Sequence, residues 1–173
     1  RCSVGDQLHP SGMLDKSTYG IVGAAYREVE KKEPWCDDVT NVADIAILSS
    51  EAETGDRDPD TGAGRVLLEG HFLFDLIDRQ VDFSKYRMLI LPDVMQIDAE
   101  LKGKVDAFLA NGGKLMLTGK SGLKKDGSGL AFDIGATWHG ESPFQPDYIE
   151  MGTLAPTFVD MPLVMYAKSQ QVK

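Results

Sequence analysis

The sequence predicts an α/β protein, with a parallel β-sheet and flanking helices, preceded by a helical segment of different character. From residue 42 onward, short apolar runs alternate with stretches of helical period, which is typical of consecutive β-α-β units. The apolar runs are continuous, as in strands covered on both faces. An acidic and polar linker, CDDVTN, stands at 36–41. We therefore expect two domains, at residues 1–38 and 42–173.

Residues 14–35 predict an amphipathic helix in the first domain. Asp15 or Ser17 can serve as its N-cap by accepting hydrogen bonds from the first free backbone amides, and Pro34 ends it. Apolar side chains recur at three- and four-residue steps, which places them on one face. These side chains are Tyr19, Val22, Tyr26 and Val29.

The second domain begins with a predicted strand, VADIAILSS at 42–50, and a polar loop at 51–64. Residues 64–71 supply about two helical turns, which Gly70 weakens. The run FLFDLID at 72–78 is short enough to be either more helix or a second strand. We favour a strand, because its apolar side chains then alternate between two faces.

The next predicted unit is a strand, a helix and a strand. YRMLILPD at 86–93 is the third strand, and KLMLTG at 114–119 is the fourth. Between them, 97–113 forms a helix with Asp98 as N-cap and a glycine pair at its end. MPLVMYAK at 161–168 is predicted as one further strand. The buried stripe of the helix is expected at Leu101, Val105, Phe108 and Leu109.

Composition argues against several classes of partner. With 18 Lys and Arg against 27 Asp and Glu, the net charge is −9, and the scattered basic residues do not suit nucleic acid. No apolar run approaches the ~20 residues of a membrane span. We therefore expect neither nucleic acid nor a membrane as partner, and no cofactor. Cys2 and Cys36 are either separate thiols or one disulfide, since their spacing does not decide.

The stretch KLMLTGKSG at 114–122 has features of two kinds of functional site. A phosphate-binding loop needs a glycine five residues before Gly119, where the sequence has lysine, so this site is not predicted. A nucleophilic serine needs a histidine base and an orienting acid. Ser121 and His139 are weak catalytic candidates of this kind, with Glu141 nearby. We favour the alternative, in which Ser121 is a polar residue of a non-catalytic turn.

Two other groups of polar residues are weak candidates for binding. Three alternate aspartates resemble the start of a calcium loop, but its glycine and its bidentate glutamate are missing, so we expect a solvated loop and no metal. These residues are Asp56, Asp58 and Asp60. The turn-rich segment before the first helix carries side chains suited to the wall of a sugar pocket. These are Asp6, Gln7 and His9.

The order of elements resembles a known family. VADIAILSS, then GAGRVLLEGHFLFDLIDRQVDFSKYRMLILPD, then KGKVDAFLANGGKLMLTGKSGL, is similar to the β-galactosidase trimerisation domain of family 42-type β-galactosidases and α-L-fucosidase-like glycosidases. The resemblance covers roughly residues 3 to 123. It implies a flavodoxin-like fold of the class I glutamine amidotransferase type, and that residues 1–38 are the tail of a (β/α)8 barrel.

The resemblance also implies a function. Such a module is non-catalytic and supports homo-oligomers, or braces its own catalytic barrel domain. True glutamine amidotransferases carry a cysteine nucleophile where this sequence has Ser121, so that machinery is absent. The catalytic carboxylates of a parent glycosidase would lie on barrel strands upstream of Arg1, and carbohydrate would be bound through the parent enzyme.

Two alternatives stay open. One is a hydrolase or an amidotransferase-like enzyme that uses Ser121 and His139. The other is a carbohydrate-binding module whose stacking platform consists of Trp138, Phe144 and Tyr148.

Overall fold

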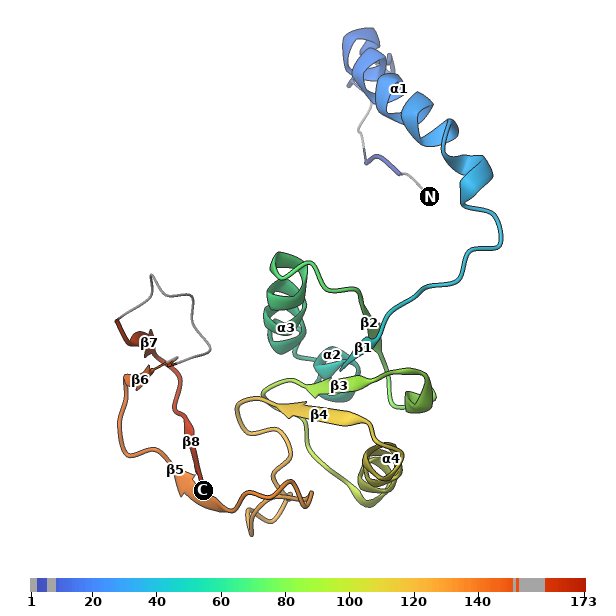
Figure 1. Cartoon of the computed structure of the whole chain (residues 1–173). Helices are drawn as coiled ribbons and strands as arrows, with labels where there is room; N and C mark the ends of the chain where they lie inside the picture. Colours follow the sequence, from blue (N-terminus) through green and yellow to red (C-terminus); the bar gives the residue numbers. More distant parts are fainter. Residues whose placement is uncertain (1–2, 6–8, 151, 153–160) are drawn as a thin grey trace. The chain divides into compact units, whose positions relative to one another are not determined.

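The chain divides into two compact units in its computed structural model, and each is described by itself (Figure 1). The units are residues 1–41 and 42–173. No helix in the described part of the chain is long and apolar enough to cross a membrane. The structure describes residues 3–5, 9–150, 152 and 161–173.

The first unit is built around helix α1, Lys16–Glu30, and a short 3-10 helix η1, Glu33–Trp35. Asp15 is the N-cap, and its carboxylate accepts a hydrogen bond from the backbone N–H of Ser17 at 2.9 Å. Hydrogen bonds from the Ser17 side chain and from its neighbours hold the pKa of Asp15 below its usual range. No residue of α1 is fully buried, and Val22 and Val29 of its apolar stripe are half-buried.

Four parallel strands form the central sheet of the second unit, in the order β2-β1-β3-β4. All four predicted strands are confirmed, including the ambiguous run at 72–78. The register aligns Ile45 with Phe74 and with Met88, and Met88 with Lys114. The strands are β1 Ile45–Leu48, β2 Phe74–Ile77, β3 Met88–Leu91 and β4 Lys114–Leu117.

Helices cover both faces of the sheet (Figure 1). Because side chains alternate along a strand, Ala46 and Leu48 pack into the larger core with α4, whereas Ile47 packs with α3. The predicted N-cap of α4 is confirmed: the Asp98 carboxylate accepts a hydrogen bond from the Leu101 N–H at 2.8 Å. The helices are α2 Ser50–Thr54, α3 Asp58–Glu69, η2 Phe83–Lys85 and α4 Ala99–Ala110.

The polar loop predicted at 51–64 is wrong, because α2 and the first half of α3 occupy it. The Ser49 hydroxyl caps α2 by accepting a backbone hydrogen bond at 3.1 Å, and Gly55 ends that helix with a φ of 81°. Asp58 and Pro59 then open α3, where the fixed φ of proline suits the first turn. The residues that indicate a loop by composition are therefore helix caps and first turns.

Two small antiparallel pairs follow β4, β5 with β8 and β6 with β7. The strand predicted at 161–168 is confirmed as β7, although it pairs with β6 outside the main sheet. The other three strands were not predicted, because their sequences lack a distinct apolar run. The strands are β5 Trp138–Glu141, β6 Asp147–Ile149, β7 Leu163–Met165 and β8 Gln170–Val172.

Candidate functional site

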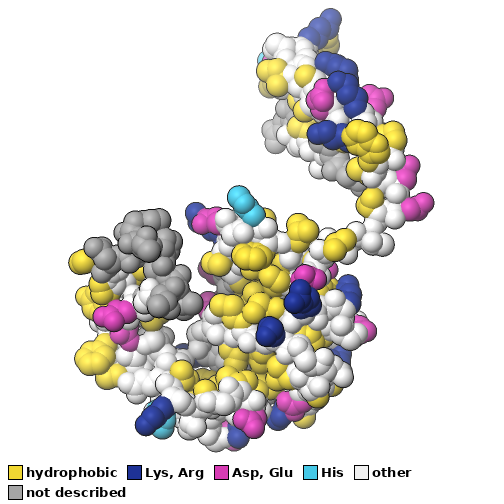
Figure 2. Space-filling model, viewed as in Figure 1, with side chains coloured by type: hydrophobic (Ala, Val, Ile, Leu, Met, Phe, Trp, Pro, Cys, Tyr) yellow, Lys and Arg dark blue, Asp and Glu magenta, His cyan; other side chains and the backbone are white. Residues whose placement is uncertain are grey.

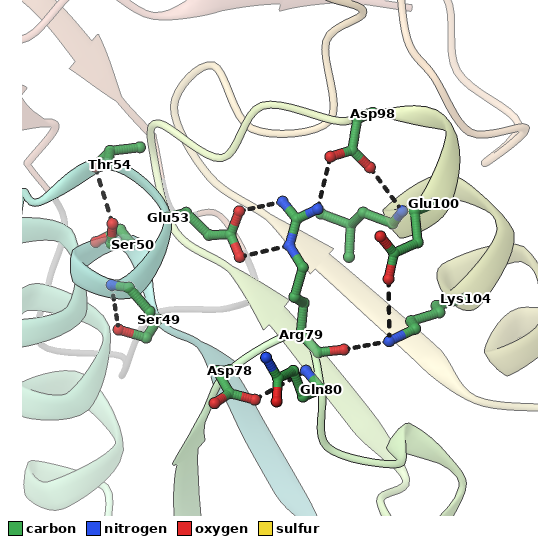
Figure 3. Close-up of polar contacts among 12 residues, drawn as sticks. Ser49, Ser50, Glu53, Thr54, Asp78, Arg79, Gln80, Asp98, Glu100 and Lys104 are labelled. Carbon is green, nitrogen blue, oxygen red and sulfur yellow. Dashed lines mark hydrogen bonds and ion pairs between the residues drawn. The ribbon is translucent and has the colours of Figure 1, made fainter.

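The carboxyl ends of the strands are where doubly wound sheets bind ligands, at the point where the strand order reverses. In this unit the order reverses between β1 and β3. The segments that leave β1, β2 and β3 carry the interacting side chains of Figure 3. These side chains decide whether this edge can hold a ligand.

Arg79, just after β2, joins these segments (Figure 3). Its guanidinium forms a bidentate pair with Glu53 of α2, with Nε donating to Oε1 at 2.7 Å and Nη2 donating to Oε2. Nη1 donates to Asp98 Oδ2 at 2.6 Å. The hydrogen bonds to Glu53 and Asp98 raise the pKa of the guanidinium, and the bond from Arg79 lowers the pKa of Asp98. The network thus connects the segments that follow β1, β2 and β3 through the side chains of Glu53, Arg79 and Asp98.

Asp60, in the first turn of α3, makes a second, buried cluster. Its Oδ1 accepts from the Ser50 N–H at 2.6 Å and from the Ser50 hydroxyl at 2.8 Å, and its Oδ2 accepts from the Ser49 hydroxyl at 2.8 Å and the Glu51 N–H at 3.1 Å. Burial raises the pKa of the carboxyl, but these hydrogen bonds outweigh burial and leave the pKa below its usual range. The carboxylate has its acceptor sites filled, which suits a structural tie between α2 and α3.

The three aspartates that resemble a calcium loop have different surroundings. Asp56 Oδ1 accepts from the Asp58 N–H at 3.0 Å, Asp58 is exposed, and Asp60 is turned inward as described above. Within the ranges that the structure describes, no group of three or more His, Cys, Asp or Glu side chains could hold a metal ion.

The turn after β4 is tied to the loop after β3. The Thr118 hydroxyl donates to Asp93 Oδ1 at 2.7 Å and accepts from the Asp93 N–H at 3.0 Å, and the Lys120 N–H donates to the Asp93 carbonyl at 2.7 Å. Gly119 has a φ of 56°, and a Cβ there would lie 2.8 Å from the Asp93 Cα. The close approach of the two loops therefore requires glycine at this position.

Ser121 is a buried connector in this turn. Its side chain oxygen accepts a hydrogen bond from the Met95 N–H at 3.0 Å, and the residue is 4% exposed. A nucleophile elbow sets its serine on a sharp, strained turn between a strand and a helix. Ser121 is not among the described non-glycine residues with positive φ, and the next element along the chain is the strand β5. These features suit a structural serine.

His139 and Glu141 lie in β5, and both are exposed. Lys120 Nζ lies 2.5 Å from Glu141 Oε1, and Lys168 Nζ lies 3.8 Å from Oε2. The hydrogen bond from Lys120 lowers the pKa of Glu141. The structure thus connects the β4 turn to β5 through Lys120 and Glu141, and Glu141, two residues after His139, is paired with lysines.

A cavity of about 860 Å³ lies between the β4 turn and the pair of β5 and β8. One wall carries Trp138, whose indole N–H donates to Gln170 Oε1 at 3.0 Å. Trp138 lies in β5 and Tyr148 in β6, so two members of the suggested stacking platform belong to different strand pairs. The lining includes Asp93, Thr118, Lys120, Ser121, Trp138 and Glu141.

The remaining candidates belong to the first unit. His9 is exposed, and its Nδ1 accepts from the Ser11 N–H at 3.2 Å. Cys36 is an exposed free thiol. The other three residues that the sequence singled out here lie outside the described residues. They are Cys2, Asp6 and Gln7.

Sequence reasoning missed Arg79 and its partner Glu53, which are 26 residues apart in the chain. No local spacing rule connects such a pair, because only the fold of the parallel sheet brings them together. Asp60 was noticed for its charge, but its partners Ser49 and Ser50 lie in a segment that the sequence assigned to the end of a strand.

Comparison with known proteins finds a family match within the second unit. Residues 65–136 match the family of β-galactosidase trimerisation domains. β-Galactosidase GalA from Bacillus licheniformis is 34% identical over 92 residues, which are 53% of this chain and 14% of that protein.

Solved structures share the fold. The α-L-fucosidase isoenzyme 2 from Paenibacillus thiaminolyticus is 40% identical with a TM-score of 0.86, over 100% of this chain and 28% of that chain. Gan42B, a GH42 β-galactosidase from G. stearothermophilus, is 20% identical with a TM-score of 0.68, over 96% of this chain and 27% of that chain, and shows the fold alone. The chain thus spans a minor part of these relatives. The sequence match and the shared fold identify residues 65–136 as a β-galactosidase trimerisation domain of the GH42 type.

Proposed function

We propose that this chain is a non-catalytic assembly module of a multidomain glycoside hydrolase, and that it joins copies of the enzyme into a homo-oligomer. The observation that carries this proposal is the match of residues 65–136 to the β-galactosidase trimerisation domain. The named relatives are β-galactosidases and an α-L-fucosidase, so the substrate of the parent enzyme is a carbohydrate. Catalysis then belongs to residues outside this chain.

The first unit is the end of the parent's catalytic barrel in this proposal, and the module also braces that barrel. The likeness to the α-L-fucosidase supports it, because it covers 100% of this chain and includes α1. The lack of buried residues in α1 also supports it. An isolated helix of this length is marginal in water, so its apolar stripe needs a partner.

The geometry of the second unit supports a structural role rather than hydrolysis. The side chain oxygen of Ser121 accepts a hydrogen bond from the Met95 amide, and Glu141 is paired with lysines. The charges at the carboxyl edge of the sheet satisfy one another through Arg79. An acyl-transfer site needs a free nucleophile beside an oriented base.

Light scattering on the 173-residue chain, combined with a fluorophosphonate probe, tests this proposal. We expect a mass above that of one copy and no labelling of Ser121. A monomer at all concentrations would contradict the assembly role, and labelling that Ser121→Ala removes would favour the hydrolase alternative.

A further inference from the structure

We infer that a second copy of this chain covers the outer edge of β2, at an apolar surface that we call the β2-edge patch. The inference rests on the proposed assembly function and names the surface that carries it. The side chains of the patch are 53% to 67% exposed. They are Leu68, Phe72, Leu73 and Leu76.

Leu68 and Leu76 lie on the α3 side of the sheet, and Phe72 and Leu73 directly precede β2. β2 stands last in the strand order, so one side of it has no strand partner within the described part of the chain. A Cβ added at Gly64 of α3 would lie 3.5 Å from the Phe74 ring, and Leu68 follows one helical turn later on that side of α3. Leu76 shares the face of Phe74, because side chains alternate along the strand. Figure 2 shows hydrophobic side chains gathered over this part of the second unit.

A free strand edge with exposed apolar side chains is expected to be covered by another part of a protein. Natural proteins blunt free edges with lysine, proline or a bulge. β2 reads FDLI, without lysine or proline, and its register with β1 is regular over all four residues. Its one charged residue, Asp75, accepts a hydrogen bond from the Tyr86 hydroxyl at 2.7 Å. At the other end of the sheet, β4 begins with the charged Lys114, and Met116 is its large exposed apolar side chain. The β2 edge differs from the β4 edge in the exposed apolar residues Leu68, Phe72 and Leu73, which lie in α3 and directly before β2.

The match to a trimerisation domain favours a second copy as the cover of this edge. All four patch residues lie within 65–136, the segment that matches the trimerisation domain. Other exposed aromatic residues, Phe144, Tyr148 and Tyr166, lie outside that segment. A ring of three copies requires a head-to-tail contact, so the patch meets a different surface of the neighbouring copy.

Matched charge substitutions on the two edge strands test the inference. Leu76→Asp and Met116→Asp change side chains that are 53% and 45% exposed on the same face of the sheet. Sedimentation velocity over a concentration series gives the dissociation constant of each variant. We expect Leu76→Asp to raise it by at least about 100-fold, because a charge is left in an apolar contact, and Met116→Asp to leave it within about threefold of the original chain.

Each result separates this inference from the proposed function. If the original chain assembles and Leu76→Asp assembles equally well, the patch is not the contact, although the assembly role stands. If Met116→Asp dissociates the oligomer as strongly, the assignment to the β2 edge is also overturned. If the original chain is a monomer throughout, the assembly role itself fails.

A milder variant and a second measurement guard against unfolding. Leu73→Ser removes apolar area at an exposed position and should weaken assembly without changing the circular dichroism spectrum. Hydrogen exchange of the β2 amides should be slower in the assembled state than in dilute solution. Equal exchange in both states would contradict a cover over this edge.

Discussion

At the scale of single residues, the second unit uses buried polar groups as ties between loops. Asp60 fixes the start of α2 to the start of α3, and Ser121 fixes the β4 turn to Met95. Both residues have the chemical type of a site residue, yet their acceptor oxygens are already used. The contribution of each residue is therefore best measured as a change in the free energy of unfolding.

Asp60→Asn should lower the free energy of unfolding by about 1–3 kcal/mol at pH 7, because an amide offers one acceptor oxygen where the carboxylate offers two. The folded pKa of Asp60 is depressed, so its contribution is present above the unfolded pKa of about 4 and is lost as pH falls through the folded pKa. Urea unfolding of both proteins at pH 7 and at pH 3 checks this. The exposed neighbour Asp58, changed to Asn, is the control, and an equal loss for both would contradict the role of Asp60.

Ser121→Ala should cost about 1–3 kcal/mol of unfolding free energy, because the Met95 amide loses its acceptor in a buried position. We expect no change in the glycosidase activity of a parent enzyme that carries the substitution. Thermal unfolding and a hydrolysis assay on that enzyme measure the two effects. Ser128→Ala, at an exposed position, should change neither, and a loss of activity without a loss of stability would revive the catalytic reading.

At the scale of elements, the Arg79 network connects β2, α2 and α4. The Arg79 and Glu53 side chains are 24% and 14% exposed, so their attraction is only partly screened by solvent. This network occupies the edge where other doubly wound sheets keep a ligand. It gives the loops a fixed geometry in place of a binding crevice.

Arg79→Met should lower the free energy of unfolding by about 2–3 kcal/mol, somewhat less than the loss expected for a fully buried pair, since Glu53 is left nearly buried without its partner. In the Arg79→Met variant, the further substitution Glu53→Gln should restore part of the lost free energy of unfolding. Chemical unfolding of the two single variants and the double variant measures the coupling. Arg65→Met removes an exposed ion pair with Glu69 and should cost about 0.3–0.5 kcal/mol. Additive effects at Arg79 and Glu53 would contradict the network.

Elements with strong local signals were predictable from the sequence. The N-cap at Asp98 and the apolar run of β3 depend on neighbours in the chain, and both predictions are confirmed. The composition of residues 51–64 predicts a loop, whereas the structure has helices there. Ser49 and Gly55 can be recognised as helix caps only when the end of the preceding strand is known. The pair of Arg79 and Glu53 depends on the fold and could not be predicted from spacing.

At the scale of the whole molecule, the exposed apolar surface has a consistent explanation. The first unit buries no residue of α1 fully, and the second leaves the β2-edge patch exposed. Large apolar patches on soluble proteins mark contacts with other domains or chains. We propose that the barrel covers the first surface and a neighbouring copy the second.

The stoichiometry of the chain in solution tests the assembly role most directly. Sedimentation equilibrium over a micromolar concentration series gives the mass independently of shape. We predict a species of three times the 18.9 kDa of one chain, which dissociates on dilution. A single species of 18.9 kDa across the whole series would contradict the assembly role.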